Sequence, residues 1–400
     1  MRARLAGSWP VLAGATLAAA TIGQAVFAAA WEFNPTVEAG YMYDDNYRLT
    51  IPGTELEVQG PLADVALEIR ALSQSNDFSI TPRVRSTYFP NQKDLDATDY
   101  FTVLDWRYTG QRANTRVRGE FSQQDIINSE QPGADVDGDL GEPDFGDAGR
   151  VLVPNRRTRL QLQPSVTFEL SPRRELQFEI AASDVSFDRE IPGAQVDYNT
   201  YGAGAGLVFR NTERSSWTLR ARGGRYETEL DESTTTIGLQ MQWDTRSAAD
   251  TRTYFRVGAE QLEFIDGGTD ISWVAGAGVS FQRGRNEMFI DLSRSIGPSN
   301  AGLVISRDQL RLRWTRDMTP RLALVFGVRG TYDDSVDPDA IYQARTYATG
   351  DLGLQWRWQE EFTLRVGIDY TWQEFDDAID DATSSGAMAS VIWQPIQRRR

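Results

Sequence analysis

The feature that most constrains this chain is an alternation of apolar and polar residues that recurs from residue 31 onward. Leu310, Leu312 and Trp314 alternate with two arginines, and residues 157–170 and 362–375 show the same period. A period of two places successive side chains on opposite faces of a β-strand. Repeated along the chain, it predicts an all-β, single-domain transmembrane antiparallel up-and-down β-barrel, with apolar side chains toward lipid and polar ones toward the lumen.

Residues 1–30 have the features of a secretory signal peptide. Two arginines precede a small apolar stretch at residues 11–23, and alanines at 28–30 form a cleavage site. The apolar stretch is too short to span a bilayer comfortably. We therefore expect export through the inner membrane and a mature chain that begins at Trp31, or at Ala29 if cleavage follows Ala28.

The composition excludes several functions. The chain has no histidine, which excludes Ser-His catalysis and metal sites with histidine ligands. It has no cysteine, and an exported protein without disulfides needs another source of stability, which a closed ladder of interstrand hydrogen bonds would supply. The net charge of −16 becomes two units more negative once the signal region is removed, which argues against nucleic-acid partners.

Eighteen strands can be placed between Trp31 and Trp393, and sixteen is the alternative. The expected strands include Pro61–Ala71, Glu287–Arg294 and Gly302–Arg316. Short polar turns alternate with longer acidic connections, and this asymmetry is typical of bacterial barrels, whose short turns are periplasmic and whose long loops are extracellular.

Aromatic residues are expected to form a belt at each end of the barrel. Tryptophans and phenylalanines gather beside the short turns, and tyrosines gather near the opposite strand ends. Amphipathic rings favour the two headgroup levels of a membrane. The expected tyrosine belt contains Tyr41, Tyr43, Tyr88, Tyr198, Tyr332, Tyr347 and Tyr370.

The polar face of the strands carries many charges, and we predict that it lines a water-filled pore. The alternative is that the two signs pair across strands and brace the wall. Small residues in Gly202–Gly206 are expected to face the lumen and to make room for a neighbouring loop or a solute. The pore-lining candidates are Arg83, Arg85, Arg116, Arg118, Arg220, Arg222, Arg311, Arg313, Arg365, Glu120, Asp244, Glu260 and Asp369.

The longest connection spans residues 128–155 and is rich in acids. Asp135, Asp137, Asp139 and Asp144 are candidate Ca²⁺ ligands, although the spacing is not that of an EF-hand. The alternatives are an acidic constriction of the pore and a solvated loop. Other acidic loops offer paired carboxylates that a glycosidase could use, but acids in surface loops are usually solvated. We expect no catalytic residue, no enzyme activity and no cofactor beyond Ca²⁺ at the acidic loops.

The start of the mature chain resembles a known family. Pro35, Gly40 and the run Tyr43–Asn46 are similar to the opening of outer-membrane proteins of the β-barrel porin 2 type. The resemblance implies an outer-membrane channel, with a link to polysaccharide export because some relatives are associated with exopolysaccharide operons. Residues 386–393 resemble the C-terminal signal that barrel-assembly machinery recognises, and residues 394–400 follow it as a short periplasmic tail.

We therefore predict a porin-like channel in the cell outer membrane of a Gram-negative bacterium. It would carry hydrophilic solutes, saccharides among them, by passive diffusion or export. The alternative is a non-enzymatic structural or assembly component of an exopolysaccharide secretion system. Expected partners are outer-membrane lipid and lipopolysaccharide, the assembly machinery, small hydrophilic solutes or polysaccharide, and further copies of the chain.

Overall fold

A computed structural model describes residues 30–129, 155–189, 195–229, 233–248, 250–265, 267–337, 343–376 and 381–396. The predicted signal peptide and the end of the C-terminal tail therefore lie outside the described residues, apart from Ala30. The strands are β1 (Ala30–Asp44), β2 (Val58–Leu72), β3 (Asn76–Thr87), β4 (Ala97–Thr109), β5 (Ala113–Asp125), β6 (Arg156–Ser171), β7 (Arg174–Phe187), β8 (Tyr198–Thr212), β9 (Ser215–Thr228), β10 (Ser233–Ala248), β11 (Thr251–Phe264), β12 (Thr269–Arg283), β13 (Asn286–Pro298), β14 (Val304–Thr319), β15 (Leu322–Ser335), β16 (Arg345–Arg357), β17 (Phe362–Phe375) and β18 (Ala382–Trp393). The helices are a 3-10 turn, η2 (Lys93–Leu95), and a short α-helix, α2 (Ile126–Ser129).

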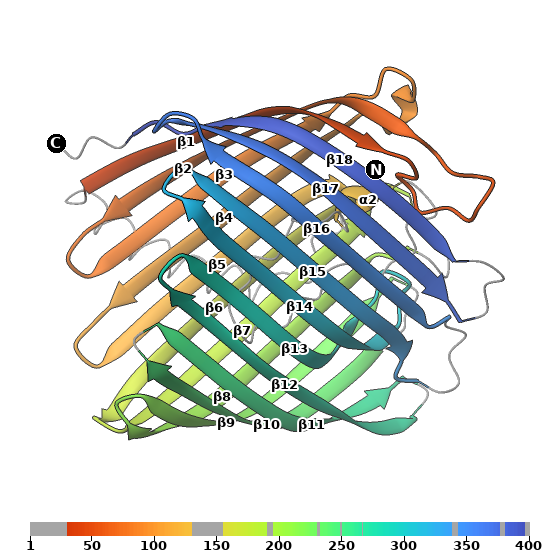
Figure 1. Ribbon diagram of the computed structural model, residues 1–400. Coiled ribbons are helices and arrows are strands. Elements are labelled where there is room, and N and C mark those ends of the chain that lie inside the picture. The colour runs from red at the N-terminus through yellow and green to blue at the C-terminus, as the bar shows by residue number, and fades with distance from the viewer. Residues whose placement is uncertain are drawn as a thin grey trace.

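The strands form one antiparallel sheet that closes on itself. Each strand pairs with the next along the chain, and β1 pairs with β18 from Val37 opposite Trp393 to Asp44 opposite Gly386. In Figure 1 the red β1 lies beside the blue β18, and all strands are steeply tilted around the barrel. Among the described residues the sheet has 18 strands, so the predicted fold is confirmed and the sixteen-stranded alternative is wrong.

Connections at the two ends of the barrel differ in length, as the sequence predicted. At one end, strands are joined by short turns such as residues 172–173, 213–214 and 284–285. Gly284 adopts a positive φ of 64° in the last of these, as the favoured types of two-residue hairpin turn do. At the other end, the connections include residues 45–57, 126–155 and 188–197.

Alternate residues of each strand face opposite sides of the barrel wall. On β10, Ile237 and Leu239 are 67% and 55% exposed, whereas Gln240 between Leu239 and Met241 is 5% exposed. A closed sheet covers its inner face and leaves its outer face open, so the exposed apolar side chains lie on the outside. The polar residues between them face the interior, which we call the lumen.

Aromatic side chains mark both ends of the outer face. On β1, Phe33 and Tyr43 are 60% and 38% exposed and lie ten residues apart. At a rise of roughly 3.3 Å per residue and a tilt of roughly 40°, they are separated by about 25 Å along the barrel axis. That is the height of an outward apolar band in an outer-membrane barrel.

Two tyrosines do not join this belt. Tyr198 and Tyr347 are 9% and 5% exposed, and their places in the alternation turn them into the lumen. Including them in the expected belt was therefore wrong.

The strands generally extend beyond the ranges expected from alternation. β13 runs to Pro298 rather than to Arg294, and β2 covers Val58–Leu72 rather than Pro61–Ala71. The reason is that the backbone ladder continues where the apolar–polar alternation has ended. β18 ends at Trp393, two residues before Pro395.

The apolar core lies at the end of the barrel with the longer connections. One cluster contains Ile126, Val185, Phe187, Tyr198, Tyr226, Leu262, Val274, Ile296, Val304 and Val336. A second contains Tyr47, Val58, Phe89, Leu95 and Ile127. Ile126 and Ile127 are consecutive residues of α2, so this helix joins the two clusters. No helix within the described residues is long and apolar enough to cross a membrane.

Candidate functional site

The strand register places all thirteen pore-lining candidates on the inner face of the wall. On β14, Arg311 and Arg313 alternate with Leu310, which is on the outer face. On β9, Arg220 and Arg222 lie on the face opposite to that of Leu219, which is 45% exposed. The remaining candidates follow the same alternation in β3, β5, β10, β11 and β17.

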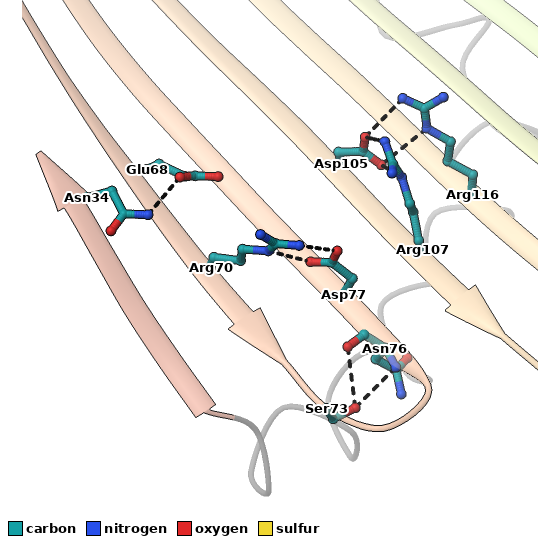
Figure 2. Close-up of polar contacts among 9 residues, drawn as sticks. All are labelled: Asn34, Glu68, Arg70, Ser73, Asn76, Asp77, Asp105, Arg107 and Arg116. Carbon is teal, nitrogen blue, oxygen red and sulfur yellow. Dashed lines mark hydrogen bonds and ion pairs between the residues drawn. The ribbon is translucent and has the colours of Figure 1, made fainter. Parts of the chain in front are cut away.

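The inner face of β2 to β5 carries arginines that are paired with acids. Asp64 is contacted by Arg83 at 2.6 Å and by Arg85 at 3.2 Å. Asp105 accepts hydrogen bonds from Arg107 at 2.8 Å and from Arg116 at 3.0 Å, as Figure 2 shows. In this sector the predicted pore-lining arginines brace neighbouring strands.

The same figure shows how these contacts continue toward the short-turn end. Arg70 donates to Asp77 at 2.6 Å, and Asn34 donates to Glu68 at 2.8 Å. Each contact joins adjacent strands. The lumen wall is thus bonded by side chains in addition to the backbone ladder.

A second charged sector covers β11 to β15 and is more deeply buried. The side chains of Arg311 and Asp291 are 2% and 1% exposed and lie 3.1 Å apart. The Tyr254 hydroxyl donates to the other oxygen of Asp291 at 2.5 Å. The guanidinium of Arg311 also lies 5.4 Å from the centre of the Phe289 ring, and Arg329 is directly opposite Arg311 in the register.

The wall of β16 to β18 and β1 is acidic in comparison. Asp351 and Asp369 are directly opposite each other on β16 and β17. Arg365 lies 3.7 Å from Glu38 of β1, across β18. Like charges directly opposite each other repel, so the two carboxylates need room to turn apart.

The remaining candidates also have oppositely charged neighbours. Arg118 contacts Glu120 at 2.6 Å, and Asp244 lies 3.6 Å from Arg252. Glu260 forms an ion pair with Arg222 across the intervening strand β10. The structure therefore brings most of the candidates into pairs.

Sequence reasoning missed the apolar side chains that face the lumen near the longer connections. Leu262 and Val274 are 0% and 2% exposed and share the inner face with Glu260. Their apolar character at positions where the alternation requires polar residues was the available signal. The polar lining therefore gives way to packed apolar groups at this end of the barrel.

The pKa of one acid in the longer connections, Asp197, is shifted by its surroundings. The Asp197 carboxylate accepts a hydrogen bond from the backbone N–H of Phe187 at 2.7 Å. Burial raises the pKa of Asp197 above its ordinary value, and the nearby carboxylates of Glu229 and Asp184 act in the same direction. The hydrogen bond opposes this rise.

The candidate Ca²⁺ ligands Asp135, Asp137, Asp139 and Asp144 lie outside the described residues. Within the ranges that the structure does describe, no group of three or more acidic side chains is placed to hold a metal ion.

No protein-family model matches the chain, and no curated protein matches it. Its fold is similar to that of several solved structures. OccK2 (OpdF) of Pseudomonas aeruginosa, solved with glucuronate, is 12% identical with a TM-score of 0.48, over 92% of this chain and 98% of that one. The outer membrane protein OpdK of the same organism is 12% identical with a TM-score of 0.46, over 91% and 99%. The outer membrane channel DcaP of Acinetobacter baumannii is 10% identical with a TM-score of 0.45, over 92% and 97%. At these values the matches carry no information on solute or partner.

Proposed function

We propose that this protein is a channel of the outer membrane, through which small hydrophilic solutes diffuse. The observation that supports it is the division of the wall into two faces. The outer face exposes apolar side chains such as Ile237 and Leu239 between two aromatic belts, and the inner face carries charges. An apolar exterior of this extent is stable in lipid and unstable in water.

The charged inner face supports a hydrated passage. Arg107 and Arg252, which lie on the inner face of β4 and β11, keep 55% and 45% of their side-chain surface exposed although both are in ion pairs. Charges on the interior of a barrel are far less costly when water reaches them than when the interior is dry. A barrel of eighteen strands is also wide enough to enclose a channel.

Reconstitution in a planar bilayer tests the proposal. The purified barrel is expected to insert and to give stepwise conductance in potassium chloride. On a gel, the unheated sample is expected to run as a folded band that shifts to the unfolded position after heating. The matched control is the same preparation after heat denaturation. A folded, inserted barrel that carries no current would refute the channel.

A second candidate function is a structural role in polysaccharide secretion. In this role the barrel is anchored in the membrane and stays closed at the end with the longer connections, which we call its mouth. The packed apolar clusters at the end with longer connections favour it, because they narrow the mouth. A deletion strain distinguishes the two. Loss of exopolysaccharide with unchanged uptake of small solutes supports the structural role, whereas slower uptake with normal exopolysaccharide supports the channel.

A further inference from the structure

Several glycines on the inner face lie between two polar residues that belong to the strands on either side. Gly204 of β8 is directly opposite Glu179 of β7 and Arg222 of β9. Gly238 of β10 is directly opposite Arg222 of β9 and Glu260 of β11. One row around the wall therefore alternates acid, glycine, arginine, glycine and acid.

The polar side chains in this row lie over the glycines. A Cβ atom at Gly204 would lie 2.7 Å from Oε1 of Glu179, and one at Gly238 would lie 2.7 Å from Cγ of Glu260. Such distances are far below van der Waals contact. Alanine at either position would thus force the acidic side chain away from the wall.

The same arrangement recurs elsewhere in the barrel. Tyr254 and Asp291 are on β11 and β13, and their hydrogen bond passes over β12, where Gly278 is directly opposite both. A Cβ at Gly386 would lie 2.5 Å from both oxygens of Asp369.

Asp351 and Asp369, the two acids that are directly opposite each other, each lie over a glycine of the neighbouring strand. The carboxylate of Asp351 lies over Gly327 of β15, and that of Asp369 lies over Gly386 of β18. The two carboxylates therefore turn in opposite directions around the wall. Their mutual repulsion is reduced without either side chain entering the lumen.

Geometry explains why glycine is needed. Strands that are two apart are separated by roughly 9.5 Å, a gap that arginine, glutamate and tyrosine can bridge only by crossing the strand between them. A side chain directly opposite both partners on that strand would occupy the crossing point, as the short distances at Gly204 and Gly238 show.

We propose that these inner-face glycines hold charged side chains flat against the wall and thereby set the open cross-section and the ion selectivity of the channel. This inference rests on the proposed function for its consequence, but not for its geometry. Gly204 is the clearest test site, because the three atoms nearest to an added Cβ all belong to the Glu179 side chain. Gly202 is the matched control, since it lies on the same strand and face and an added Cβ would meet only the Gly223 carbonyl oxygen at 3.6 Å.

The first experiment measures stability and does not require conduction. Melting temperatures in detergent are compared for wild type, Gly204→Ala, Glu179→Ala and the double variant. Gly204→Ala is expected to lower the melting temperature, and this loss should disappear in the Glu179→Ala background. Gly202→Ala should have the smaller effect. An equal loss with and without Glu179 would show that the backbone alone requires glycine and would overturn the proposal.

The second experiment measures the channel. Gly204→Ala is expected to lower single-channel conductance and to shift the reversal potential in a salt gradient, because the displaced carboxylate enters the lumen. Gly202→Ala should leave both unchanged. Equal conductance and reversal potential in the two variants would overturn the consequence for selectivity. If the wild-type barrel carries no current, the proposed function fails, and the melting temperatures still decide the role of the glycines.

Discussion

The buried ion pair between Arg311 and Asp291 allows a sharp test of how the lumen wall is stabilised. Asp291→Ala removes the carboxylate that faces the Arg311 guanidinium at 3.1 Å and also removes the acceptor of the Tyr254 hydroxyl. Both charged side chains are almost fully buried. Removing one partner of a buried pair typically costs about 3–5 kcal/mol, because the other charge remains buried. The equilibrium constant for folding should therefore fall by roughly a hundredfold to a thousandfold or more.

The assay is reversible unfolding in guanidinium chloride with the barrel refolded into lipid vesicles. The matched control is Arg107→Ala on the inner face of β4, which removes a 55% exposed side chain from its pair with Asp105 at 2.8 Å and leaves Arg116 on that carboxylate. Exposed pairs contribute about 0–1 kcal/mol. If the two variants lose the same free energy of unfolding, water reaches Arg311 as freely as it reaches Arg107, and the reasoning from burial is refuted.

Three further predictions concern the outer face, the mouth and the pH dependence. Leu239→Arg should destabilise the barrel in vesicles by about 2–4 kcal/mol because it places a charge in lipid, whereas Gln240→Arg on the inner face should cost less; equal costs would contradict the assignment of faces. Ile126→Ala should lower the free energy of unfolding by about 2–5 kcal/mol, because it opens a cavity in the first apolar cluster, and should raise conductance; unchanged values in both measurements would show that Ile126 does not close the mouth. Because the pKa of Asp197 is raised in the folded protein, its contribution to stability is lost as pH rises from below about 4 through the folded pKa. Asp197→Asn, which can still accept the hydrogen bond from Phe187, should flatten this decline in unfolding measured at several pH values, and an unaltered slope would refute the assignment.

The fold could be predicted from the sequence because the alternation reports directly on a wall with two different environments. Leu310 and Arg311 differ in hydropathy because one faces outward and the other faces the lumen, and this difference repeats in strand after strand. The alternation does not report strand ends beyond the apolar band. For this reason β13 was expected to end at Arg294, although its ladder continues to Pro298.

The contacts of the lumen could not be predicted, because they depend on register and not on alternation. Arg222 and Glu260 were both assigned to the inner face, but only the pairing of three strands shows that they meet across Gly238. The apolar groups of the mouth were missed for a related reason. Leu262 and Val274 have the parity of pore-lining residues and the hydropathy of core residues.

Taken together, the two parts of the interior have different consequences for a solute. The apolar clusters joined at α2 lie at the mouth and carry no charge, so we expect them to limit how fast a solute enters without distinguishing anions from cations. The charges held along the wall over Gly204 and Gly238 would distinguish them, because their signs and positions are fixed. A change at Ile126 should therefore alter conductance with little change in reversal potential, whereas a change at Gly204 should alter both. If Ile126→Ala shifts the reversal potential as much as Gly204→Ala does, the mouth and the wall do not act separately.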